Sequence, residues 1–341
     1  MFGNIRIKII MYLSYGEKLY YYKTQFTTDY YKKKDSENPK NYFWLALNSL
    51  LTLLIIKAGS IVNMDNRLAV HKAIKKHQVW IFFVLTLVIA LITSQLIFQM
   101  NLDVYNSVTG FLVYLLYILS PAIMAAILLA LLSGGKDLLS LLKGLARWKV
   151  GVQWYLVAII MVVIVEGLTT AIFIITGNNI PERYTLAPLS LNVTIYIIIS
   201  AIGLAIGLGY AFSVLLKNYG PIVSAAITGI FLVIYKGFIS IHDPNIIIMS
   251  VGLFTLAFLL VWLYYYTKRS ILIMAIFLAV YVYMSNMLTF GIASDSGTVL
   301  PIVINKIIYI LITLAIIVLD MNFFFEKRPL SGDGMADKAD S

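Results

Sequence analysis

Eight apolar runs, each about 20 residues long, constrain this chain more than any other feature of its sequence. A helix of that length crosses the hydrocarbon core of a bilayer, so each run predicts a membrane-spanning helix. Hydrophobic residues make up 61% of the chain and charged residues 12%, which lies outside the usual range of soluble domains. We therefore expect an all-α, polytopic membrane bundle of eight transmembrane helices. The runs are Trp80 to Phe98, Thr109 to Leu132, Trp154 to Thr176, Val193 to Leu216, Gly220 to Ile241, Ile246 to Tyr266, Ile271 to Ile292 and Val299 to Leu319.

Basic residues are distributed unevenly among the loops between these runs. The loops after the first, third, fifth and seventh runs contain a single basic residue, Arg183. By the positive-inside rule, the other loops and both chain ends face the cytoplasm. This predicts a multi-pass protein of the cell membrane with cytoplasmic N- and C-termini. The basic residues of the other loops are Lys136, Lys143, Arg147, Lys149, Lys217, Lys268 and Arg269.

The chain divides into three parts by composition. Residues 1–78 are basic and rich in tyrosine, which is typical of a cytoplasmic segment at the membrane interface. Residues 79–320 form the transmembrane domain, and residues 321–341 are predicted to be a disordered cytoplasmic tail. Within the first part, Phe43 to Ile56 is a shorter apolar run with basic flanks. We predict an interfacial or re-entrant helix there, and a ninth span is the alternative.

Lys136 to Lys149 has leucines spaced for one apolar helical face, with cations beside them. This pattern predicts an amphipathic helix on the cytoplasmic surface. The net charge of +10 is accounted for by membrane topology, so the lipid bilayer is the expected partner and nucleic acid is not.

Residues that carry metal or redox chemistry are scarce. The chain has no cysteine and three histidines, His71, His77 and His242. We therefore expect neither a metal nor a cofactor. The glycine and histidine motifs of soluble nucleotide-binding and hydrolytic enzymes are also missing from the sequence, as are the internal repeats of transporters.

Four polar side chains interrupt the apolar runs at similar depths, namely Glu166, Lys236, Asn286 and Lys306. At a rise of about 1.5 Å per residue they fall in one layer of the bundle. A charge in hydrocarbon costs at least about 2.5 kcal/mol, so we expect Glu166 to pair with Lys236 or Lys306. The alternative is that each lysine extends separately to the interface, with Glu166 neutral in an apolar niche.

Short motifs along the chain follow a recognisable order. They are Ser120-Pro121-Ala122, Ala125, Gly134-Gly135, Leu142 to Tyr155, Gly209-Tyr210 and Tyr219-Gly220-Pro221. In order and spacing, the stretch from Trp80 to Leu319 resembles the CPBP intramembrane proteases, which include the CAAX prenyl proteases and the bacterial Abi proteins.

The resemblance places that family's catalytic residues on positions that lack them. Its paired glutamates fall on Gly203 and Leu204, and its arginine falls on Leu208. Its first histidine falls on Lys236, and its histidine and asparagine pair falls on Val282 and Asn286, so that the asparagine alone is kept.

Loss of the glutamates removes the residue that activates water in that family. General acid–base catalysis contributes about 10²- to 10⁴-fold to a rate. The resemblance therefore implies a pseudoprotease without catalytic residues, which acts by binding another membrane protein or a hydrophobic or prenylated peptide. Bacteriocin immunity is one setting that it suggests.

Two other functions remain open. The first is an active intramembrane endopeptidase, CAAX-processing or bacteriocin-related, with a displaced site that uses Glu166 as the base. The second is a small-molecule or ion transporter.

Overall fold

The computed structural model of this chain describes residues 8–15, 18–25, 64–104, 107–133, 136–180, 190–241 and 243–325. The chain forms two compact units, Met1–Lys76 and His77–Ser341, and each is described by itself. The predicted helix Phe43 to Ile56 and most of the predicted tail lie outside the described residues.

The N-terminal unit contains a β-hairpin that the sequence analysis did not predict. Strand β1 (Lys8–Tyr15) pairs antiparallel with β2 (Lys18–Gln25), in a register that sets Lys8 opposite Gln25. The first segment contains two isoleucines and two tyrosines and the second contains three tyrosines, residue types that favour strands.

The second unit is helical, as predicted. In the described part of the chain, eight helices are long and apolar enough to cross a membrane. Helix α2 begins in the first unit and contains a non-helical residue, His77. The helices are α2 (Met64–Gln99), α3 (Val108–Ser133), α4 (Lys136–Leu145), α5 (Val152–Ile175), α6 (Leu191–Asn218), α7 (Pro221–Ile239), α8 (Ile246–Tyr266), α9 (Ile271–Ser285), α10 (Gly291–Ser296), α11 (Leu300–Leu319) and α12 (Met321–Phe325).

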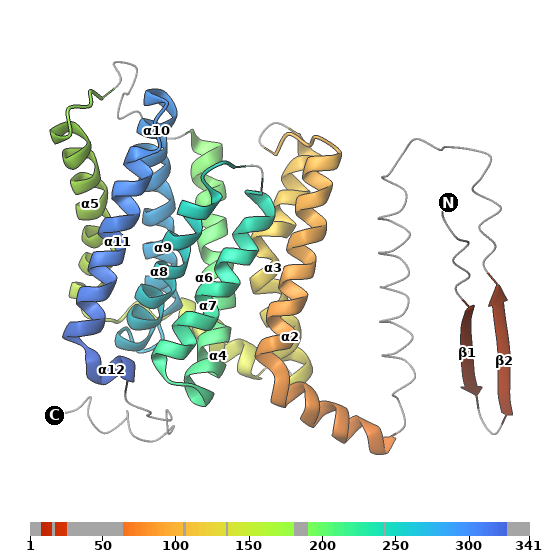
Figure 1. Ribbon diagram of the computed structural model, residues 1–341. Coiled ribbons are helices and arrows are strands. Elements are labelled where there is room, and N and C mark those ends of the chain that lie inside the picture. The colour runs from red at the N-terminus through yellow and green to blue at the C-terminus, as the bar shows by residue number, and fades with distance from the viewer. Residues whose placement is uncertain are drawn as a thin grey trace, which may run out of the picture. The chain divides into compact units, whose positions relative to one another are not determined.

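The long helices of this unit lie alongside one another, and the short helices α4 and α12 lie at the same end of the bundle (Figure 1). Helix α4 stops at Leu145, four residues before the predicted end at Lys149. Tertiary contacts explain the difference. The Arg147 side chain donates to the carbonyl of Lys268, and the Ser270 hydroxyl donates to the carbonyl of Arg147 at 2.8 Å. These bonds hold the chain after α4 against the turn between α8 and α9.

Helix α6 packs closely on α3 through glycines. A Cβ atom on Gly203 would lie 2.7 Å from the carbonyl oxygen of Ile118, and one on Gly207 would collide with Pro121. Small residues that let two backbones approach are typical of helix contacts in membranes.

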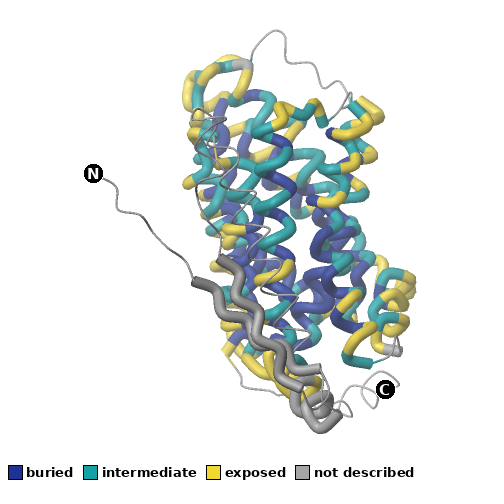
Figure 2. The backbone as a smooth tube through the Cα atoms, turned by 90° about the vertical axis from the view of Figure 1, so that its right-hand side faces the viewer, coloured by how far each residue is buried: buried dark blue, intermediate teal, exposed yellow. Residues whose placement is uncertain are grey.

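The outer faces of the helices are apolar as well as the core. Buried residues follow the inner faces along the length of the bundle (Figure 2). Large apolar side chains also face outward in the middle of the helices, among them Leu116, Leu156 and Ile164. A helix that is apolar on all sides is suited to lipid on its outer face.

Candidate functional site

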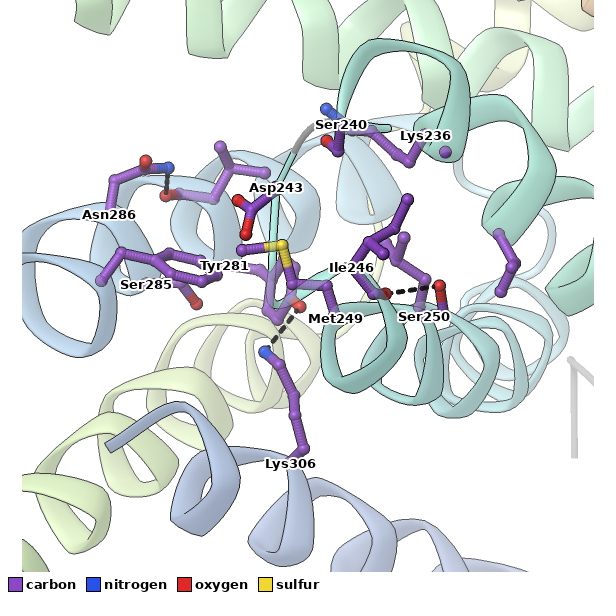
Figure 3. A pocket seen from close by; sticks show the side chains of 15 residues that line it. Lys236, Ser240, Asp243, Ile246, Met249, Ser250, Tyr281, Ser285, Asn286 and Lys306 are labelled. Carbon is purple, nitrogen blue, oxygen red and sulfur yellow. Dashed lines mark hydrogen bonds between the residues drawn. The ribbon is translucent and has the colours of Figure 1, made fainter. Parts of the chain in front are cut away.

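A cavity of about 400 Å³ lies among α7, α8, α9 and α11. Lys236 lies on the α7 wall with Ser240, and Lys306 enters from α11 on another side (Figure 3). The polar residues that line the cavity are Lys236, Ser240, Asp243, Ser250, Tyr281, Ser285, Asn286 and Lys306. The apolar lining comes mainly from Val233, Ile246, Met249, Leu253, Val282 and Phe290.

Helix α7 brings Lys236 to the cavity at its C-terminal end. Lys236 lies in the last turn, where the helix dipole favours a cation. Its main-chain carbonyl accepts a hydrogen bond from the amide of Ser240 at 3.1 Å. The side chain is half-buried, and its ammonium makes no hydrogen bond or ion pair with any residue that the structure describes. Lys236 is therefore an unmatched cation in the cavity wall.

The seventh span changes its hydrogen-bond pattern beside the cavity. After Ser285 the α-helix becomes a π-helical turn, Asn286–Phe290, before α10 begins. Such turns are rare and frequently occur at functional sites. Asn286 lines the cavity and donates its side-chain amide to the carbonyl of Val282 at 2.7 Å.

Glu166 on α5 is fully buried and accepts three hydrogen bonds. Ser285 donates to Oε1 at 2.7 Å, Thr289 donates to Oε2 at 2.5 Å, and the Asn305 amide donates to Oε1 at 3.1 Å. An ionised carboxyl group is an acceptor with two oxygens, so these three donors match it. Hydrogen bonds of this kind are what allow a charge to be buried.

Asn305 connects Glu166 to Lys306. The Lys306 ammonium donates to Asn305 Oδ1 at 2.9 Å and to the Tyr281 hydroxyl at 3.3 Å. It also lies 5.5, 5.6 and 5.7 Å from the ring centroids of Tyr281, Phe290 and Tyr309, within the range of cation–π interactions. The Asn305 amide therefore links the Glu166 carboxylate to the Lys306 ammonium.

Gly252 on α8 leaves room for the Lys306 side chain. A Cβ atom at this position would lie 2.5 Å from Lys306 Cδ and 2.8 Å from Cε. Any larger residue at position 252 must therefore displace the lysine from its present path.

Three of the four residues predicted to share a polar layer line this cavity, namely Lys236, Asn286 and Lys306. The fourth, Glu166, does not line it and reaches Lys306 through Asn305.

Sequence reasoning missed three partners of Glu166. Asn305 could have been recognised as a candidate partner from the sequence, because it is an amide next to Lys306 inside an apolar run. Ser285 and Thr289 could not have been recognised in this way, because hydroxyl residues in apolar helices commonly bond only to their own helix backbone.

Of the six positions assigned by the family resemblance, all of which the structure describes, three line this cavity and three do not. Val282, like Lys236 and Asn286, lines the cavity. Gly203 faces α3, Leu208 is fully buried in the core, and Leu204 packs against that core.

Within the described ranges, no three His, Asp or Glu side chains come together as a metal-binding group. No protein-family model matches the sequence, and a search of curated proteins finds no similar protein. The fold and the site define the class: this is a multi-pass integral membrane protein with a cavity among its helices that both polar and apolar residues line.

Proposed function

We propose that this protein is a non-catalytic relative of the CPBP intramembrane proteases that binds a membrane ligand in the cavity lined by Lys236, Asn286 and Lys306. One observation carries the proposal. Apart from the loop residue Asp243, the polar groups of the described cavity wall are ammonium, amide and hydroxyl groups, whereas proteolysis by activated water needs a general base within reach of that water.

Neither nearby carboxylate is well placed for that role. Asp243 is the only carboxylate among the described lining residues. It follows α7 in a loop, and its Oδ1 accepts the amide hydrogen of Asn245 at 2.8 Å. Glu166 is fully buried, bonded to three donors and not part of the cavity wall. To act as a base, Glu166 would have to give up hydrogen bonds that stabilise its charge.

A cleavage assay tests the proposal directly. The full-length protein in liposomes is incubated with a prenylated peptide and with an unmodified hydrophobic peptide, and products are followed by mass spectrometry. We expect cleavage no faster than in protein-free liposomes. Cleavage that is lost in Glu166→Gln and kept in Asp137→Asn would contradict the proposal and support a displaced protease site. Asp137 is a suitable control because it is an exposed acid on α4.

Transport is the second candidate function, because the buried network of Glu166 and Lys306 adjoins the cavity. Ionisable residues inside a membrane often mark an ion or proton pathway. Uptake of a solute into proteoliposomes that depends on an ion gradient and on Glu166 would favour transport over binding.

A further inference from the structure

We infer that the cavity binds the acidic head group of a single-chain amphiphile, a carboxylate or a phosphate monoester at the end of an acyl chain. This inference rests on the proposed binding function and specifies the chemistry of the ligand.

Lysine hydrogens supply most of the free donors on the cavity wall. The Lys236 ammonium carries three N–H groups, and no residue in the described part of the chain accepts them. Lys306 has bonded two of its N–H groups, to Asn305 and Tyr281, which leaves one for a ligand. The Tyr281 hydroxyl accepts from Lys306 and keeps its own hydrogen to donate.

Acceptors on the wall come mostly from neutral groups. Asp243 has one oxygen already bonded to the amide of Asn245. Asn286 offers its Oδ1 and also a second N–H beyond the one bonded to Val282. The Ser250 hydroxyl has given its hydrogen to the carbonyl of Ile246 at 2.7 Å. A ligand that bonds the three free N–H groups of Lys236 must bring acceptor oxygens.

The charges around the cavity also favour an acidic ligand. Glu166 balances the charge of Lys306 through the Asn305 amide. Asp243 also lines the cavity but makes no ion pair with Lys236, so Lys236 has no bonded counter-charge among the described residues. Hydrogen bonds from an ammonium to a carboxylate or phosphate are roughly twice as strong as neutral ones. An acidic group between the two lysines would give Lys236 a bonded counter-charge.

The apolar part of the cavity favours an acyl chain over a peptide. An extended peptide adds an N–H donor with nearly every residue, and the ammonium of Lys236 cannot accept a hydrogen bond from any of them. An acyl chain adds no polar group and can pack against Val233, Leu253 and Val282. The volume of about 400 Å³ lies within the usual range of small-ligand sites.

The test measures binding of radiolabelled oleate to the full-length protein in phosphatidylcholine nanodiscs. Unlabelled oleate, oleyl phosphate, oleyl alcohol and a hydrophobic peptide serve as competitors. The variants are Lys236→Gln, Lys236→Arg and, as a matched control, Lys217→Gln, which removes an exposed cation near the end of α6. The melting temperature of each variant verifies its folding.

We expect the acids to bind saturably and oleyl alcohol to compete at least about tenfold more weakly. Lys236→Gln should weaken binding of the acids about ten- to hundred-fold, Lys236→Arg should restore most of it, and Lys217→Gln should leave it unchanged. The stronger of the two acidic competitors then identifies the head group as carboxylate or phosphate.

Other results would overturn the inference. Equal competition by oleyl alcohol, or unchanged affinity in Lys236→Gln, would show that the site holds an apolar chain without recognising an acid, and the binding function would stand. Competition by the peptide alone would replace the acyl ligand with a peptide. No binding of any probe would count against both the inference and the proposed function.

Discussion

Tyr117 on α3 and Tyr235 on α7 each donate their hydroxyl hydrogen to the main-chain carbonyl oxygen of the other, at 2.8 Å and 2.7 Å. The two rings stack with their centroids 4.9 Å apart, and both side chains are buried. Because Tyr235 directly precedes Lys236, this reciprocal pair holds in place the turn of α7 that forms the cavity wall.

Removing either hydroxyl should loosen that turn. We expect Tyr235→Phe to lower the free energy of unfolding by about 1 kcal/mol, the scale of hydrogen bonds between transmembrane helices. Thermal unfolding in detergent measures the loss. Tyr219→Phe is the control, since Tyr219 is partly exposed at the end of α6. Equal melting temperatures for the two variants would mean that the reciprocal bonds add nothing.

The buried carboxylate should matter for stability more than any surface acid does. Glu166→Ala leaves Ser285, Thr289 and Asn305 without their acceptor and Lys306 without its counter-charge. Leaving a buried charge without its compensating partner costs about 3 to 5 kcal/mol, whereas Asp137→Asn on the surface should cost no more than about 1 kcal/mol. Denaturant titration of both variants compares the two losses.

A second substitution separates the lost charge from the lost packing around Glu166. Adding Lys306→Met to Glu166→Ala should recover part of the stability, because the unpaired cation is removed as well. A double variant less stable than Glu166→Ala would show that the two residues do not compensate each other.

Two glycines form a matched pair for testing the path of Lys306. Gly252→Ala forces the lysine side chain to move, and such overpacking typically costs about 1 to 3 kcal/mol. Gly167→Ala meets nothing within 4 Å and should be neutral or slightly stabilising. Melting temperatures measured side by side check this difference. Equal tolerance of the two substitutions would contradict the described path.

The predicted topology can be tested without removing any native thiol, because the chain has no cysteine. Lys143 on α4 and Asn179 after α5 are both exposed. A membrane-impermeant maleimide applied to intact cells should label Asn179→Cys and spare Lys143→Cys until the cells are permeabilised. The opposite labelling pattern would invert the orientation.

The spanning helices could be predicted because their signal is local. Length and apolarity within each run suffice, and the predicted limits of the sixth run, Ile246 to Tyr266, are those of α8. The seventh run was predicted as one helix, Ile271 to Ile292. Its π-helical turn could not be foreseen, because the turn forms a contact with another helix, in which Thr289 donates to the Glu166 carboxylate on α5.

Only the charged residues of the candidate site could be predicted from the sequence. Glu166, Lys236 and Lys306 are conspicuous in apolar runs, but which of them meet depends on how the helices are rotated against one another. The Asn305 bridge is a product of that rotation. The N-terminal hairpin was missed for a different reason, since its tyrosines and lysines also suit the membrane interface.

The π-helical turn changes how the seventh span can be read residue by residue. One additional residue in a helical turn rotates everything after it by about 100°. Ile271–Ser285 and Gly291–Ser296 therefore do not share a single periodicity of inward and outward positions. A substitution scan along this span should show tolerance that repeats every 3.6 residues, and the phase of that repeat should jump at Asn286.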